Sequence, residues 1–148
     1  MGQDDAARRE PGMAAGEPSG EVYDWYVRGR SLLDAGDAAA AVQVLGHAAR
    51  AEPGSRSIRE ALARAQFQAG QLPESRESFA QLVEVDPADD YARFGLGLTC
   101  RRLGDLRAAV EHLSLAVAMR PDLTHYGREL AYARAALGKA PLRRPEPG

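Results

Sequence analysis

The fold of this chain is decided by residues 90–123, DYARFGLGLTCRRLGDLRAAVEHLSLAVAMRPDL. Gly104 separates two stretches with helical apolar spacing, and Pro121 follows the second stretch. Glycine ends a helix readily because it accepts a left-handed backbone, and proline prevents a helix from continuing. The segment therefore predicts two helices joined by a tight turn.

The same punctuation recurs along the chain. Glycines spaced 34 residues apart are Gly36, Gly70, Gly104 and Gly138, and prolines with the same spacing are Pro53, Pro87 and Pro121. Two staggered stop signals in each repeat predict two helices in each repeat. We therefore expect a domain over residues 21–138, with repeats at about 22–55, 56–89 and 90–123 and one extra capping helix at 124–137. Residues 1–20 and 139–148 are rich in glycine or proline and are expected to be flexible tails.

Small and large side chains recur in step with these stop signals. The first helix of each pair, and the extra helix, carries a small residue at one position: Gly29, Ala63, Gly97 and Ala131. The second helix carries a small position (Ala41, Ser75, Ala109) and a large one (Leu45, Phe79, Leu113). Small side chains at fixed points let antiparallel helices approach closely, and the large residue fills the remaining space. Asp37, Asp105 and either Asp89 or Asp90 are expected to cap helix N-termini.

This pattern resembles the tetratricopeptide repeat (TPR) family, whose repeat of 34 residues has a Trp, Leu-Gly, Tyr, Ala, Phe, Ala, Pro signature. The matching residues are Trp25, Gly29, Leu32, Ala41, Leu45, Ala48 and Pro53 in the first repeat, Leu62, Ala63, Phe79 and Pro87 in the second, and Leu96, Gly97, Ala109, Leu113, Ala116 and Pro121 in the third. Arg59 and Arg93 stand where the signature has tryptophan. The resemblance implies an all-α fold, a right-handed α-solenoid of three TPR helix-turn-helix repeats with a C-terminal solvating helix.

Composition limits the classes of function. The 148 residues carry a net charge of −2, which argues against a dedicated nucleic-acid binder. There is no apolar run long enough for a membrane span, and the N-terminal residues do not resemble a signal peptide. A single cysteine, Cys100, is consistent with a reducing compartment, so we expect a cytoplasmic protein.

Catalytic chemistry is not indicated. His47, His112 and His125 stand at no recurring metal-ligand spacing. Cys100 occupies an inward-facing position of a first helix, which favours an inert buried thiol over a nucleophile. We therefore expect a protein that is not an enzyme and that holds neither a metal nor a cofactor.

The resemblance also implies where a partner would bind, because first helices line the concave groove in this family. The family's groove-facing positions correspond here to Tyr23, Tyr26, Arg30, Arg64, Phe67, Tyr91, Phe94, Leu98, Arg101, Arg102, Arg128 and Tyr132. The first helices carry a net positive charge and the second helices a net negative charge. Arginine pairs with carboxylates and aromatic rings bury apolar groups, so the expected ligand is an acidic and hydrophobic peptide segment of a protein partner.

One family activity is tested by the residues themselves. Members that bind the C-terminal tails of heat-shock chaperones use a clamp of lysine, asparagine and arginine side chains. The corresponding positions here are Tyr26, Arg30, Ala61, Tyr91 and Gly95. Only Arg30 is basic, which argues against binding of such tails.

The leading interpretation is therefore a non-catalytic adapter or scaffold, as a monomer or a weak homo-oligomer. The alternatives are a self-associating structural scaffold and a secretion-type TPR chaperone with a hydrophobic client. An RNA-binding helical repeat is disfavoured by the net charge and by the lack of a repeated base-reading pair.

Overall fold

The computed structural model describes residues 20–140, and every regular element in that range is a helix. The helices are α2 (Gly20–Asp34), α3 (Ala38–Ala51), α4 (Arg56–Gln68), α5 (Leu72–Val85), α6 (Asp90–Arg102), α7 (Leu106–Met119) and α8 (Thr124–Lys139). None of these helices is both long and apolar enough to cross a membrane. The expected tails lie outside the described residues, apart from Gly20, which begins α2, and Lys139 and Ala140.

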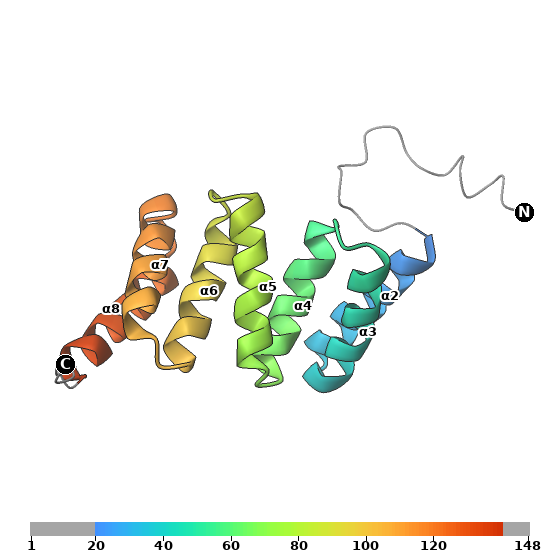
Figure 1. The fold of residues 1–148 in the computed structure, drawn as a ribbon, viewed down its shortest axis with the longest axis horizontal. Coiled ribbons are helices and arrows are strands. Elements are labelled where there is room, and N and C mark those ends of the chain that lie inside the picture. The colour runs from blue at the N-terminus through green and yellow to red at the C-terminus, as the bar shows by residue number, and fades with distance from the viewer. Residues whose placement is uncertain (1–19, 141–148) are drawn as a thin grey trace, which may run out of the picture.

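The helices lie side by side in chain order, with α2 and α8 at opposite ends of the long axis (Figure 1). Each helix packs against the next along the chain. In addition α2, α4, α6 and α8 contact one another in sequence, whereas α3, α5 and α7 lie farther apart from each other. We call α2, α4, α6 and α8 the inner layer, because the stack is tighter along them, and α3, α5 and α7 the outer layer.

The predicted turns are present at the first three of the regularly spaced glycines. Gly36, Gly70 and Gly104 adopt φ values of 84°, 79° and 86°, in the left-handed region that favours glycine. Gly138 has the same spacing but stays inside α8, which runs to Lys139 rather than ending at residue 137. Glycine permits a left-handed turn without imposing one, and no described helix comes after α8 to pack back against it.

Aspartate side chains cap three helices, as the sequence predicts. The carboxylates of Asp37, Asp89 and Asp105 accept hydrogen bonds from backbone N–H groups three residues ahead, at 3.2, 3.1 and 3.3 Å. Each bond satisfies a donor that the first turn of a helix leaves free. The choice between Asp89 and Asp90 is thereby settled in favour of Asp89.

The two helices of a repeat cross at a point where one side chain is nearly absent. A Cβ atom added to Gly29 would lie 2.5 Å from the side chain of Leu45. In the third repeat, a Cβ on Gly97 would lie 2.7 Å from Leu113 Cγ and 3.2 Å from the Leu113 backbone nitrogen. Leu45 and Leu113 are fully buried, so the predicted small and large positions face each other.

Helix α8 covers the apolar end of the third repeat. Tyr126 is 2% exposed, and its ring stacks on Phe94 of α6 with centroids 4.2 Å apart. Tyr126 Oη donates a hydrogen bond to Asp90 Oδ2 at 2.7 Å. The opposite face of α8, including Ala131 and Tyr132, is exposed, so Ala131 shares the repeat position of Gly29 without a crossing helix to face.

A pair of glycine substitutions tests this crossing. We expect Gly97→Ala to lower the free energy of unfolding, because overpacking a core costs about 1–3 kcal/mol and outweighs the gain in helix propensity. Gly127→Ala in α8 is the matched control, since a Cβ there meets nothing within 4 Å. The control should raise the free energy of unfolding by up to about 1 kcal/mol. Urea unfolding followed by circular dichroism measures both, and a stabilising Gly97→Ala would contradict the close crossing.

Candidate partner-binding face

The residues expected to face a partner all lie on the inner layer, but they differ in exposure. The exposed members are Tyr23, Arg30, Tyr91, Arg102, Arg128 and Tyr132. The half-buried members are Tyr26, Arg64, Phe67, Leu98 and Arg101, and the buried member is Phe94. We use the term inner face for the exposed and half-buried members of this set.

At the N-terminal end, α2 presents a strip of aromatic and basic groups. Tyr23, Tyr26 and Arg30 share one side of the helix because residues three and four apart are neighbours on its surface. The rings of Tyr23 and Tyr26 are 6.4 Å apart, and the Arg30 guanidinium lies 5.6 Å from the centre of the Tyr26 ring. This strip offers apolar area and a positive charge side by side.

The middle of the inner face joins α4 to α6. The guanidinium of Arg102 lies over the Phe67 ring, 5.2 Å from its centre, which is the geometry of a cation–π contact. Tyr91 packs its ring edge-on to Phe79 at 6.4 Å and still remains 36% exposed. Burial raises the pKa of the Tyr91 hydroxyl, and nearby Arg64 opposes that rise. Tyr91 therefore both packs between repeats and reaches the surface beside Arg64.

An acidic residue that the sequence reasoning did not select also lies here. Glu60 of α4 is half-buried, and burial raises the pKa of its carboxyl group, with Asp89 adding to the rise. Arg64, Arg56 and Arg30 oppose that rise, so their guanidinium groups are its electrostatic neighbours. Glu60 stands four residues before Arg64, a spacing that places both side chains on one face of α4. This spacing is visible in the sequence and could have indicated that Glu60 lies beside Arg64.

At the C-terminal end, two of the expected residues, Phe94 and Arg101, contact other side chains of the protein. Phe94 is 8% exposed, stacks on Tyr126 and meets the His125 ring edge-on at 5.4 Å. It belongs to the core between α6 and α8 and not to the surface. Arg101 Nη1 forms an ion pair with Glu129 Oε2 at 2.7 Å, and both side chains are half-buried.

The cysteine and two of the histidines pack against neighbouring side chains. Cys100 is 3% exposed, and burial raises the pKa of its thiol, which keeps it protonated at neutral pH. The His47 ring packs against Trp25 with centroids 4.3 Å apart. His112 is half-buried, and its Nδ1 lies 3.4 Å from Arg93 Nη1. Burial and the positive charge of Arg93 lower the pKa of the His112 imidazole. Between residues 20 and 140, His, Cys, Asp and Glu form no group of three that could hold a metal ion.

Comparison with known families gives one match along most of the described chain. The tetratricopeptide repeat model matches residues 26–82 and 60–124. These overlapping ranges cover the three helix pairs from residue 26 of α2 onward and reach the start of α8.

Solved structures share the fold. MamA from Desulfovibrio magneticus RS-1 superposes with a TM-score of 0.76 at 21% identity, covering 80% of this chain and 67% of MamA. The first TPR domain of Spaghetti (RPAP3), bound to the HSP90 peptide SRMEEVD, superposes with a TM-score of 0.75 at 16% identity, covering 80% of this chain and 94% of that domain.

Among curated proteins, mouse Superkiller complex protein 3 is 29% identical over 120 residues. The aligned region is 81% of this chain but only 8% of that protein. The chain thus spans a small part of this relative's length.

Proposed function

The chain belongs to the tetratricopeptide repeat family, and on that premise we propose that it is a non-catalytic adapter that binds a peptide segment of a protein partner on its inner face. The repeats and their structural neighbours support an interaction module. The observation that carries the proposal is the gathering of exposed tyrosine and arginine side chains on one layer of helices. These side chains are enriched where proteins bind one another.

The charges on the inner face favour an acidic ligand. Among residues 20–140, no carboxylate lies within ion-pair distance of Arg30, Arg64 or Arg102. Each guanidinium is therefore able to form a two-pronged hydrogen-bonded pair with a carboxylate of the ligand. The exposed rings of Tyr23 and Tyr132 at the two ends would bury apolar side chains of the same peptide.

We also propose that the partner is a protein and that the chain is cytoplasmic. The near-balanced net charge supports a protein partner over a nucleic acid. The single buried cysteine is consistent with a cytoplasmic location. Self-association as a structural scaffold is one alternative, and action as a secretion-type chaperone is the other. Light scattering distinguishes self-association from the adapter hypothesis, because an adapter without its partner is expected to be monomeric.

A charge reversal on the inner face tests the ligand class. A displayed library of random peptides, selected on the wild type, should enrich sequences that combine Asp or Glu with aromatic or aliphatic residues. The double variant Arg64→Glu/Arg102→Glu should bind the selected peptides at least 10-fold more weakly, because repulsion replaces two ion pairs.

The matched control carries the same change of charge on the outer layer. Arg76→Glu/Arg107→Glu alters two exposed arginines of α5 and α7 and should bind the peptides as the wild type does. Circular dichroism and melting confirm folding, and Arg30→Glu/Arg128→Glu replaces the first variant if that one unfolds. Equal losses of peptide affinity in the inner and outer variants, or enrichment of basic peptides, would contradict the proposal.

A second prediction concerns chaperone tails. The clamp positions Ala61 and Gly95 are buried, and a Cβ on Gly95 would already strike the Phe79 ring at 2.4 Å. Neither position is able to present a donor to a terminal carboxylate. In fluorescence anisotropy, SRMEEVD should bind this chain no more tightly than a scrambled peptide of the same composition ending in the same residue. The RPAP3 domain serves as positive control, and a clear preference for SRMEEVD would contradict the prediction.

A further inference from the structure

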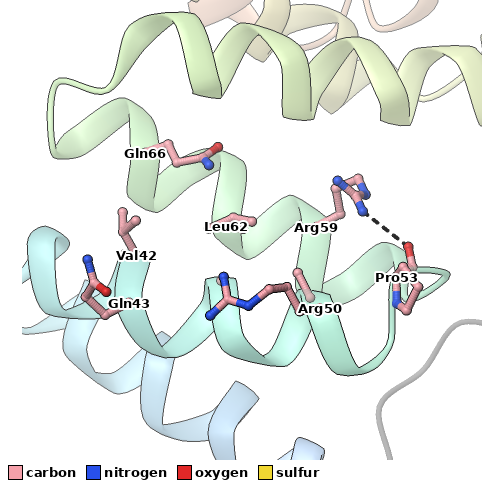
Figure 2. Close-up of a pocket in the computed structure, with 9 residues that line it drawn as sticks. Val42, Gln43, Arg50, Pro53, Arg59, Leu62 and Gln66 are labelled. Carbon is pink, nitrogen blue, oxygen red and sulfur yellow. Dashed lines mark hydrogen bonds between the residues drawn. The ribbon is translucent and has the colours of Figure 1, made fainter.

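A recess separate from the inner face lies between α3 and α4, with a volume of about 480 Å³. Figure 2 shows side chains of both helices around it, with Val42 and Arg50 from α3 and Arg59, Leu62 and Gln66 from α4. Ligand sites in proteins commonly have volumes of roughly 300–1,000 Å³. We call this recess the α3–α4 cleft.

The cleft and the inner face lie on different sides of α4. Successive residues of a helix are rotated by about 100°. Arg59, Leu62 and Gln66 therefore share one side of α4, while Arg64 lies on roughly the opposite side and Phe67 about a quarter turn away. A ligand in the cleft would not occupy the surface that we assign to the peptide partner.

Small residues of α3 create the space. Gly46 and Ala49 both line the cleft. At the equivalent positions of the second repeat the chain has the larger pair Ala80 and Val83. The third repeat has Ser114 and Val117 there. The first repeat therefore carries smaller side chains at these two positions than the later repeats do.

The polar side chains that line the cleft are two arginines and two glutamines, Arg50, Arg59, Gln43 and Gln66. Arg50 and Arg59 each contribute a guanidinium group, and neither forms an ion pair within residues 20–140. Arg59 is held in place because its Nη2 donates to the carbonyl oxygen of Pro53 at 3.3 Å. The side-chain oxygen of Gln66 accepts a hydrogen bond from Ser78 Oγ at 2.7 Å, which leaves the amide N–H groups as donors.

Acidic residues are absent from the lining of the cleft. In the next repeat, Glu84 stands at the position of Arg50, so the corresponding junction lacks the second positive charge. Val42 and Leu62 supply apolar surface beside the guanidinium groups. The cleft thus combines an anion-binding end with room for a short hydrocarbon chain.

We propose that the α3–α4 cleft is a second binding site, which takes a carboxylate carried on a short aliphatic chain. The carboxylate pairs with Arg50, whose guanidinium lies nearest Gly46, and the aliphatic part contacts Val42 and Leu62. The same chemistry has two sources, a free aliphatic acid and the C-terminal residue of a polypeptide that ends in leucine or valine. The proposal does not depend on the function assigned to the inner face.

Titration of the full chain with 4-methylpentanoate, followed by backbone amide NMR shifts, tests the site. We expect saturable shifts at Gly46, Arg50 and Leu62. The neutral analogue 4-methylpentanamide should bind at least 10-fold more weakly, because it does not pair with guanidinium groups. N-acetyl-Ala-Leu is the second probe: tighter binding than the free acid assigns the source to a polypeptide terminus, and weaker or equal binding assigns it to a small acid.

Two variants and a control complete the experiment. Gly46→Leu fills the cleft and should abolish binding, and it should still fold because a Cβ at Gly46 meets only the tip of Arg50, at 3.6 Å. Arg50→Gln should weaken binding severalfold. Arg107→Gln makes an equal change of charge at an exposed side chain of α7 and should leave binding unchanged. Shifts that map elsewhere, equal binding of the amide, or normal binding by Gly46→Leu would each overturn the proposal.

Discussion

The rest of this structure depends on the close crossing of the two helices in each repeat. At Gly29 and at Gly97 the facing leucine side chain occupies the space where a methyl group would stand. Such contact fixes how far one helix is able to slide or rotate against the other, because protein cores are packed at crystal-like density. Repeats fixed in this way stack in register, and the stacking places α2, α4, α6 and α8 together on one side.

Much of the fold could be predicted because its determinants are local and periodic. Turn glycines, capping aspartates and alternating small and large residues each act over a few positions, so they are visible in the sequence. Gly138 shows the limit of this reasoning: it repeats the spacing, yet α8 continues through it. A glycine permits a helix to end without forcing it to, so its spacing alone does not decide whether the helix stops there.

For the candidate partner-binding face, the sequence indicated which helices carry the expected residues, but not how each side chain packs. Family positions indicate which side of each first helix faces inward, and that side holds the exposed tyrosines and arginines. The pairing of Arg101 with Glu129 and the stacking of Phe94 on Tyr126 depend on how α8 settles on α6. The α3–α4 cleft escaped detection for a similar reason, because Gly46 and Ala49 become a space only when α4 lies against them.

A nearly neutral chain thus presents two surfaces of different chemistry. The inner face spreads arginines among tyrosines over several helices, which suits an extended acidic segment. The cleft places the Arg50 guanidinium beside a small apolar area, which suits one carboxylate. Because the two surfaces lie on different sides of α4, a partner on one leaves the other open.

The most direct test of the inner face is a map of where an acidic peptide touches the protein. A peptide enriched on the wild type, amidated at its C-terminus so that it offers no terminal carboxylate to the cleft, is titrated into the full chain while backbone amide NMR shifts are recorded. The account predicts that the largest shifts fall on α4 and α6 around Arg64, Phe67 and Arg102. Shifts confined to α5 and α7 would contradict it, because the peptide would then bind the outer layer.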